Sequence, residues 1–483
     1  MPGSPLPGSP VRPLELDDDR ILPTEPTVRA IAREIFAAVR DLPLISMHGH
    51  VEASVLAHDE PFPDPAQLLV VPDHYVTRML VSQGTRLEEL GVPRRDGGPV
   101  ERDGRTIWRR FCSGWHLFRG TPSRFWLEQE LHDVFGVRVQ PSVETADAIY
   151  DQILDRIGRP EFRPRALFDS FGLEILATTD APASALDDHA AIAASGWGGV
   201  VVPTFRPDAL VHLARPTWKQ DVEELGAVAG RDVSGYAGFL DALQQRREHF
   251  VRLGARATDH GHVTADTTPL ERVDAERIYA AALAGAVTPA EAEAFAAHML
   301  FEMARMSRDD GLVMQIHPGV LRNHDPAVHE RFGPDKGFDI PLPVDFVRGL
   351  RPMLSAFGID PGFRCVVFTV DETTYSRELA PLAGAYPAMR LGVPWWFLDS
   401  PLAMRRFREA VTETAGFYNT AGFVDDTRAF ASIPARHDVA RRVDSGFLAQ
   451  LVAEGQLRID EAIETAVDLT VTIPREAYAP RGA

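Results

Sequence analysis

The stretch Asp41–His50, with the sequence DLPLISMHGH, decides how the rest of the chain is interpreted. Its first part is a short apolar run with the length and composition of a buried β-strand. Its last part carries two histidines, His48 and His50, separated by one glycine. Side chains two residues apart on a strand point the same way, so both imidazoles can face one cation. The stretch therefore predicts a strand that ends in chemically active groups.

The same form, a β-rich run followed by a polar or turn-forming tip, recurs along the chain. Amphipathic helical stretches lie between these runs, for example at 289–303, and strands that alternate with helices predict a parallel sheet. Polar tips on six or more strands favour a closed barrel, where all the tips meet on one face. In an open doubly wound sheet they would meet only near the switch point. The other predicted strands are 173–180, 199–206, 311–317, 364–371 and 421–426.

The chain has 483 residues. Length alone suggests about three domains, but an elaborated α/β barrel can take up roughly 400 residues as one domain. Residues 1–27 are rich in Pro, Gly and Asp, and we expect a flexible arm there because such a composition buries little apolar surface. Residues 28–483 are expected to form a single barrel domain. The stretch at about 85–165 interrupts the alternation, holds three tryptophans and is interpreted as a helical insertion after an early strand.

The composition excludes several classes of function. The chain has 50 Lys and Arg against 69 Asp and Glu, a formal net charge of −19, whereas a nucleic-acid-binding protein needs a basic face. No run approaches the roughly 18 apolar residues of a membrane span, and the first residues lack the pattern of a secretory signal. The two cysteines, Cys112 and Cys365, are too few for a disulfide scaffold and fit a reducing cytoplasm.

The pair His48 and His50 is the strongest candidate for a metal site. Neutral imidazole suits zinc and other borderline divalent cations. Hydrogen-bonded structural histidines produce the same spacing, so the pair alone is weak, but its position at a strand tip favours a metal. After the last predicted strand, Asp426 can ligate a metal or move a proton, and Arg428 can bind an anion. The alternative for Asp426 is a cap on the following helix.

Single histidines stand at two further predicted tips, His260 and His317. Each alone is more commonly structural, but their recurrence at equivalent tips favours a shared site. In another loop His74 and Tyr75 can donate hydrogen bonds or move protons, while a turn capped by Asp73 is an equal alternative.

Arginines at strand tips predict an anionic small-molecule substrate for this acidic protein. Arg206 stands at one tip, and Arg256, Arg322 and Arg428 are further candidate cations. The pair Trp395–Trp396 can wall a pocket, although core packing explains it better. No glycine-rich phosphate-binding motif follows a predicted strand.

Taken together, these motifs resemble the uronate (glucuronate) isomerase family of the amidohydrolase superfamily, over about residues 31–478. No single motif is decisive, and the specificity comes from their order and spacing. The matching motifs are His48-Gly-His50, Asp73-His-Tyr75, Thr178-Thr-Asp180, Phe205-Arg-Pro-Asp208, Asp259-His-Gly261, Gln315-Ile-His317 with Arg322-Asn323, Gly333 to Asp339, Trp395-Trp-Phe397, Asp426-Thr-Arg428 and Arg436-His437.

The resemblance implies a distorted (β/α)8 barrel of the amidohydrolase type with a helical insertion after the first strand. It implies an isomerase that interconverts D-glucuronate with D-fructuronate, and D-galacturonate with D-tagaturonate, through an enediol. One divalent cation, often zinc, and a small uronate are the implied partners, and a homo-oligomer is left open. The implied metal ligands are His48, His50 and Asp426, the implied catalytic residues are Asp426, Arg428, Tyr75 and His317, and the implied substrate-binding residues are His74, Arg206, Arg322 and Trp395.

These side-chain types suit the isomerisation. The reaction must open the sugar ring, take a proton from C2 and return one to C1. Asp426 is the expected base for ring opening, because a metal and neighbouring charges set its proton affinity. Arginine is a poor base, with a pKa above about 12, so we expect Arg428 to stabilise the enediolate electrostatically and Tyr75 to move the proton.

Three residues depart from the family pattern. Thr427 replaces a serine, Asp425 adds a carboxylate beside a candidate ligand, and His262 is an extra imidazole. The alternatives to an isomerase are a mononuclear metal-dependent hydrolase on the same barrel and a sugar-acid binder without turnover. A hydrolase has no need of the pair Arg206 and Arg428, and this favours the isomerase.

Overall fold

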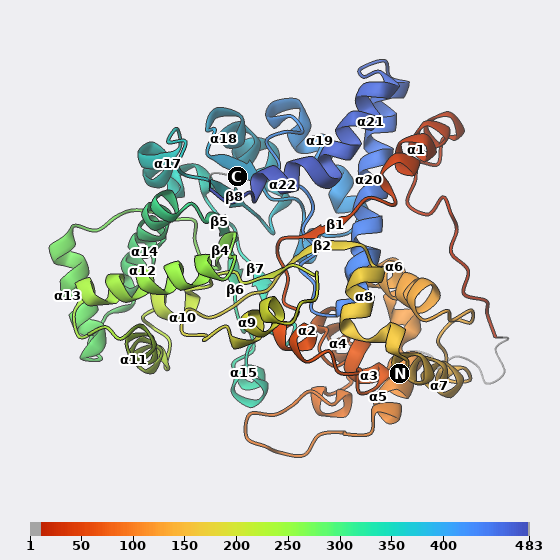
Figure 1. Ribbon diagram of the computed structural model, residues 1–483, viewed down its shortest axis with the longest axis horizontal. Helices are drawn as coiled ribbons and strands as arrows, with labels where there is room; N and C mark the ends of the chain where they lie inside the picture. Colours follow the sequence, from red (N-terminus) through yellow and green to blue (C-terminus); the bar gives the residue numbers. More distant parts are fainter. Residues whose placement is uncertain (1–10, 482–483) are drawn as a thin grey trace.

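Seven parallel strands lie at the centre of the protein in two hydrogen-bonded sheets (Figure 1). The computed structural model describes residues 11–481. Neighbouring strands within each of these sheets pair in parallel, and the chain crosses between them through helices, as parallel pairing requires. Across the two sheets the strands are β1 (Leu44–Ser46), β2 (Leu173–Ala177) and β3 (Val201–Val202), then β4 (Ala257–His260), β5 (Val313–Ile316), β8 (Cys365–Val367) and β9 (Met389–Leu391).

Single backbone bridges join these two sheets into one ring. Phe205, just after β3, bridges to Thr258 on β4. Residues 420–427, here called the closing segment, bridge to Leu391 on β9 and to Gly49 beyond β1. The seven strands and the closing segment therefore make an eight-membered ring, and the predicted distorted (β/α)8 barrel is confirmed.

The closing segment replaces the regular strand expected at 421–426. Gly422 and Asp426 have φ angles of 78° and 47°, and such left-handed values interrupt the extended backbone of a strand. The other predicted strands each contain an observed one. β9 lies in a stretch that was not predicted as a strand, because Arg390 interrupts its short apolar run.

Helices surround the ring, with α10–α13 on one side in Figure 1 and α19–α21 beside α1 on the other. Among residues 11–481, no helix is both long enough and apolar enough to cross a membrane. A two-stranded antiparallel pair, β6 (Val320–Leu321) and β7 (Ile340–Pro341), encloses α15 (Pro326–Phe332). The other helices outside the insertion are α1 (Pro26–Val39), α9 (Asp187–Ala194), α10 (Asp208–Val211), α11 (Trp218–Ala229), α12 (Tyr236–Arg252), α13 (Arg272–Leu283), α14 (Pro289–Asp310), α16 (Phe346–Gly349), α17 (Arg351–Phe357), α18 (Ala380–Ala385), α19 (Pro401–Ala415), α20 (Ile433–Ala453), α21 (Ile459–Val467) and α22 (Ile473–Ala477).

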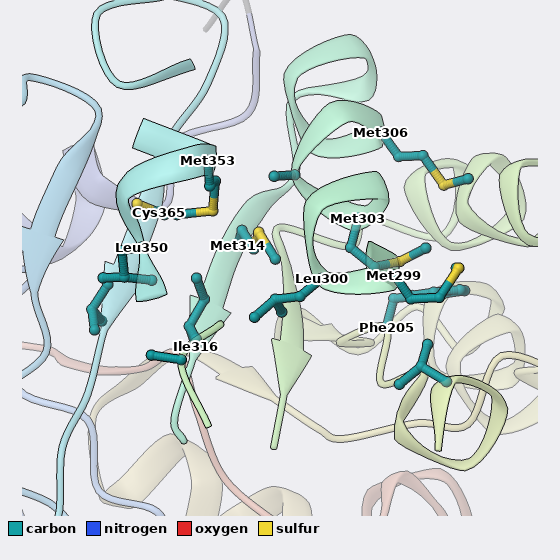
Figure 2. Packing of buried hydrophobic residues seen from close by; sticks show 14 of the residues in the cluster. Phe205, Met299, Leu300, Met303, Met306, Met314, Ile316, Leu350, Met353 and Cys365 are labelled. Atoms are coloured by element: carbon teal, nitrogen blue, oxygen red, sulfur yellow. The ribbon is translucent and has the colours of Figure 1, made fainter. Parts of the chain in front are cut away.

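The packing of α14 on the barrel shows how the core is built (Figure 2). Met299, Leu300 and Met303 on this helix belong to one buried cluster with Met314 on β5, and each of the four is 0% exposed. Such apolar burial stabilises the fold by about 25 cal/mol per Å² removed from water. The helix packs against one side of β5, and the carboxyl-terminal tips of the strands remain available to polar groups.

The helical insertion is longer than predicted. It occupies the whole connection between β1 and β2 and begins near residue 53 rather than 85. Its own core contains the buried aromatic residues Trp108, Phe111 and Phe118. The helices of this insertion are α2 (Ala53–His58), α3 (Pro65–Leu69), α4 (His74–Val81), α5 (Gly104–Ser113), α6 (Pro122–Gln129), α7 (Ala146–Ile157) and α8 (Pro164–Ser170).

The segment 11–25 differs from the flexible arm expected over residues 1–27. Leu14 is 1% exposed in the core of the insertion, and its backbone N–H donates to the carbonyl of Arg138 at 2.9 Å. Arg20 forms an ion pair with Asp438 on α20 at 2.9 Å. A few apolar and charged residues thus fix a Pro-rich segment whose composition alone predicts a flexible chain. Residues 1–10 of the expected arm lie outside the described part.

Candidate active site

The candidate site residues collect at the carboxyl ends of the barrel strands. His48 and His50 follow β1, Asp259 lies on β4, and His317 follows β5. Asp426 lies in the closing segment, beside the end of β1. Parallel strands in a closed ring direct all these ends to one face, which is where catalytic groups collect in such barrels.

The three predicted metal ligands converge. One oxygen of Asp426, Oδ1, lies 3.2 Å from His50 Nε2 and 3.6 Å from His48 Nε2. Two backbone hydrogen bonds fix this arrangement, one from Asp426 N to the carbonyl of His48 (3.1 Å) and one from His50 N to the carbonyl of Thr427 (2.8 Å). The left-handed φ of 47° at Asp426 is uncommon for a residue other than glycine. The last bridge of the barrel thus places the ligands.

The donor set fits a divalent cation. Both ring nitrogens of His48 and the Oδ1 of Asp426 are buried without a hydrogen-bond partner among the described residues. Two imidazoles and a carboxylate are a usual ligand set for zinc and similar cations. Asp426 does not cap a helix, since the next helical turn begins after Ala429.

The protonation states at this cluster agree with a positive charge held between its members. Burial raises the pKa of Asp426, but His48 and His50 outweigh burial and hold it well below its usual range. Burial and the nearby Arg428 lower the pKa of His50 to about 4, so this imidazole is neutral at pH 7, which is the form that ligates a metal. Burial opposes a proton on His48, but Asp259 and Asp426 raise its pKa overall.

Asp259 is a site residue to which the sequence interpretation assigned no role, although it lies in the matching motif Asp259-His-Gly261. It is 0% exposed, and its Oδ1 lies 2.6 Å from His317 Nε2 and 3.8 Å from His48 Nδ1. Its other oxygen lies 3.2 Å from Arg206 Nη1. Burial raises its pKa, yet His317 and Arg206 hold the pKa of Asp259 well below the usual range. An aspartate inside a short buried strand was the available signal.

Arg206 is anchored by two carboxylates at the tips of β3 and β4. Its Nε donates to Asp208 Oδ2 at 2.9 Å, and its Nη1 pairs with Asp259. Burial alone would lower the pKa of Arg206, but these two aspartates raise it overall. Its guanidinium is therefore a fixed cation at the edge of the site.

Tyr75 and His74 begin α4, where Asp73 accepts from Tyr75 N at 2.8 Å as the helix cap. The predicted cap is present, and it holds Tyr75 in place. The ring of Tyr75 stacks on that of His74 with centroids 4.8 Å apart, and the guanidinium of Arg436 lies 5.0 Å from its centroid. Burial raises the pKa of Tyr75, and its hydroxyl has no partner among the described residues.

Arg428 and Arg322 come together through one aspartate. Asp335 Oδ1 lies 3.6 Å from Arg428 Nη2 and 3.5 Å from Arg322 Nη1. Arg322 also pairs with the buried Asp339 at 3.0 Å. His74 and Asp335 line a cavity of about 180 Å³. The segment between β6 and β7 therefore carries a second arginine toward Arg428.

A buried network lies behind the candidate metal ligands, formed largely by residues that the sequence named but to which it assigned no role. Arg436 on α20 donates to the backbone carbonyl of Asp425 at 3.0 Å and to Asp399 Oδ2 at 3.2 Å. It also lies 3.8 Å from the centroid of Trp126. The carboxylate of Asp425 lies 3.1 Å from His437 Nε2. Asp425, the additional carboxylate noted in the sequence, therefore faces His437. Arg436 contacts both the closing segment and the ring of Tyr75.

Two candidates from the sequence lie away from the cluster. His260 is 0% exposed with its Nε2 2.8 Å from Thr258 Oγ1, a structural hydrogen bond. Arg256 precedes β4 and therefore lies at its amino end, opposite the site. Trp395 packs in a core cluster, as the sequence favoured, and it contacts His48 and His317 edge to face, with centroids 5.6 and 4.9 Å apart.

The chain is similar to proteins of known family over nearly its full length. The family model described as glucuronate isomerase matches residues 26–471. A uronate isomerase from Rhizobium meliloti is 55% identical over 466 residues, which cover 96% of this chain and 99% of that protein. The crystal structure of a glucuronate isomerase from Caulobacter crescentus has a TM-score of 0.95 and 51% identity, with 97% of each chain covered. A uronate isomerase structure from Thermotoga maritima has a TM-score of 0.90 and 29% identity, covering 96% of this chain and 99% of that one.

Proposed function

The chain belongs to the glucuronate isomerase family and is an aldose–ketose isomerase of uronates, and we propose that it interconverts D-glucuronate with D-fructuronate and D-galacturonate with D-tagaturonate at the site described above. The observation that supports this site is the position of a metal-ligand cluster, His48, His50 and Asp426, within one face that also carries arginines. An anionic sugar needs both an anchor for its carboxylate and cations around its oxygens. The hydrolase considered from the sequence accounts for neither the arginines nor the family membership.

We infer that His48, His50 and Asp426 hold one divalent cation, and we propose zinc, because two neutral imidazoles and a carboxylate suit it. When bound, such a cation supplies a positive anchor for the substrate carboxylate and an adjacent hydroxyl. Asp259 Oδ1 lies 3.8 Å from His48 Nδ1, beyond hydrogen-bond distance. Its negative charge is proposed to favour the orientation in which His48 Nε2 faces the cation.

The sugar ring opens by proton transfer at the C1 hydroxyl. Asp426 is proposed to take this proton as the C1–O5 bond breaks, and the ring oxygen receives one. Asp426 has a lowered pKa and is ionised at pH 7, so it is in the basic form. His317, whose Nε2 lies 2.6 Å from the buried Asp259 Oδ1, is proposed to assist at the same atoms, because that carboxylate attracts its ring.

The isomerisation itself moves one proton from C2 to C1, while the O2 hydroxyl proton ends on O1. No atom is gained or lost, and because C2 is oxidised as C1 is reduced, the reaction needs no external oxidant. Arg428 is proposed to stabilise the negative charge that develops on the enediolate oxygens through the positive charge of its guanidinium. Burial raises the pKa of Tyr75, so its phenol stays protonated and is proposed to donate to the enediolate and relay the proton.

The other residues proposed for substrate binding are Arg206, Arg322, His74 and Trp395. Arg206 and Arg322 are each held by aspartates at 2.9–3.2 Å, so neither must reorganise greatly to clamp a substrate oxygen. Trp395 lies against His48 and His317 and excludes water from their rings.

The decisive assay uses the purified protein with glucuronate and with galacturonate, with and without a chelator, and follows ketose formation. We expect ketose from at least one sugar and a loss of turnover after chelation. Ketose formation in D₂O should place deuterium at C1 of the ketose if the enediol exchanges with solvent. Protein of verified metal content that forms no ketose from either sugar would refute the substrate proposal.

Metal content tests the ligand proposal separately. His50→Asn should lower bound zinc per chain, as measured by elemental analysis of the folded variant. The matched control is His58→Asn, because His58 has a side chain that is 65% exposed on α2. Equal zinc in both variants would show that His50 is not a ligand.

A further inference from the structure

A second group of ligand-type side chains lies beside Arg206, at the tips of β3 and β4. Asp208 begins α10, His212 follows that helix, and His262 comes two residues after β4. We call these three residues the β3–β4 cluster. His262 is the extra imidazole that the family pattern does not account for, and the reaction proposed above does not use it.

The spacing within the β3–β4 cluster suits an ion. One ligand atom from each residue lies within 4.8 Å of the other two. In the described part of the chain, no hydrogen bond joins Asp208, His212 and His262 to one another through their side chains. Donors around a tetrahedral zinc, with bonds of about 2.1 Å, lie about 3.4 Å apart. Small side-chain rotations therefore bring the three donors onto one cation.

His262 provides the second, independent observation. Its side chain belongs to a residue only 5% exposed, and its Nε2 is buried without a hydrogen-bond partner among residues 11–481. A buried polar atom of this kind destabilises the fold unless something binds it. The ring lies 4.9 Å from that of His212, centroid to centroid. A shared ligand between the two rings would satisfy the orphaned nitrogen.

The neighbours of the cluster orient its members as in known metal sites. His212 Nε2 lies 3.1 Å from the carbonyl oxygen of Gly261, and when Nε2–H donates there, Nδ1 is left as an acceptor. Asp208 accepts from Gly261 N at 3.0 and 3.2 Å with its two oxygens and from Arg206 at 2.9 Å. Such hydrogen bonds fix ligand orientation, and a carboxylate still has lone pairs for a cation.

We propose that Asp208, His212 and His262 bind a second divalent cation of the zinc class, separate from the one assigned to His48, His50 and Asp426. Arg206 already pairs with Asp208, and its positive charge repels a cation bound to the same carboxylate. The second site therefore binds its cation more weakly than the first. A cation there competes with Arg206 for Asp208 and leaves Arg206 paired with Asp259 (3.2 Å). The second ion can therefore change the position of the Arg206 guanidinium, which is proposed to bind the substrate.

The test measures zinc stoichiometry on the full chain, independently of turnover. Metal-free protein is dialysed against a series of zinc concentrations and analysed for zinc per chain. We expect two binding steps for the wild type, with the weaker step lost in His262→Ala. The matched control His249→Ala removes a half-buried histidine on α12 that donates no ligand to either cluster, and it should keep both steps.

The variant His48→Asn with His50→Asn separates the two sites. It should lose the tighter step and keep the weaker one, and its cobalt form should retain visible absorption bands that His262→Gln abolishes. If His262→Ala does not fold, as judged by circular dichroism, this double variant and His262→Gln decide the question. One zinc per wild-type chain at saturation, or a weaker step that survives in His262→Gln, overturns the proposal. Failure of the isomerase assay would leave this result unaffected.

Discussion

Single residues in this site owe their chemistry to the partners that hold them. Asp426 is ionised because two imidazoles face one of its oxygens, and Asp259 is ionised because His317 and Arg206 face it. Arg428 differs, since its one ion pair in the described chain is a 3.6 Å contact with Asp335. A weakly held guanidinium is free to follow charge that develops on a substrate.

Replacement of Arg428 tests its role in the transition state. Arg428→Met should lower kcat by about 10²- to 10³-fold, the usual effect of removing one donor that stabilises developing negative charge. The side chain is 24% exposed, so the melting temperature should change little. Steady-state kinetics and zinc analysis check both points. Arg331→Met, which removes a half-exposed arginine from α15, serves as control, and a kcat within twofold of wild type in Arg428→Met would contradict the assignment.

Asp399 gives the protein a pH dependence of stability. Burial raises the pKa of Asp399 to about 8, although Arg436 acts in the opposite direction, whereas an unfolded aspartate titrates near 3.9. The folded state therefore binds more protons between about pH 4 and pH 8, so this contribution to stability is complete below pH 4 and is lost as the pH rises through 8. Asp399→Asn cannot titrate and should flatten the fall in melting temperature between pH 6 and pH 8.5.

The control for this experiment is Asp41→Asn, at an aspartate whose side chain is 82% exposed. Its melting temperature should follow the wild-type pH profile. An unchanged slope in Asp399→Asn would mean that Asp399 is already ionised at neutral pH beside Arg436.

At the scale of elements, the segment from β6 to β7 brings Arg322 to the site. The carboxylate of Asp339 accepts from Asn323 N at 2.7 Å and from Arg322 at 3.0 Å, so one buried side chain fixes both the backbone and the arginine. The β6–β7 pairing holds the ends of this segment through backbone hydrogen bonds, whereas Arg322 depends on the Asp339 carboxylate.

Removal of that carboxylate should loosen the segment alone. Asp339→Ala is expected to speed amide exchange over 320–341, measured by mass spectrometry, and to raise KM several-fold as Arg322 loses its support. The control Asp325→Ala, in the same segment, removes only the cap of α15 and should leave KM unchanged. Equal KM values for both variants would show that Asp339 does not position Arg322.

The sequence predicted those parts of the site that follow from strand periodicity. His48, His50 and Asp426 stand at strand tips, and a parallel barrel must bring such tips together. Asp259 and Arg436 lie in motifs that match the family, but the sequence assigned them no role: one is a buried residue of a short strand, and the other lies on a long helix whose inner face cannot be identified before the chain is folded. Their roles depend on residues from other elements, which no local pattern reveals.

At the scale of the whole molecule, the N-terminal segment links distant parts of the chain. Composition predicts disorder for residues 11–25. The segment is ordered instead, because it lies beside apolar surfaces that its leucines can enter. Leu14 enters the core of the insertion, while Leu22 enters a cluster of α1, α20 and α21. The segment therefore connects the insertion to the barrel.

The contribution of this segment can be measured with one substitution. Leu14→Ala should lower the free energy of unfolding by about 2–4 kcal/mol, the usual effect of truncating a fully buried leucine, as measured by urea denaturation. Val11→Ala, at a residue 58% exposed, should have almost no effect. Indistinguishable midpoints for the two variants would mean that the segment is only loosely attached.

The closing segment has a consequence for how the protein matures. The two imidazoles of the cation site are synthesised early and the carboxylate late, and only the final bridge of the ring, Gly49 to Thr427, sets them side by side. A nascent or truncated chain therefore lacks part of the candidate ligand set. Uptake of the proposed cation would therefore follow closure of the ring, and the bound cation would join the segment after β1 to the closing segment.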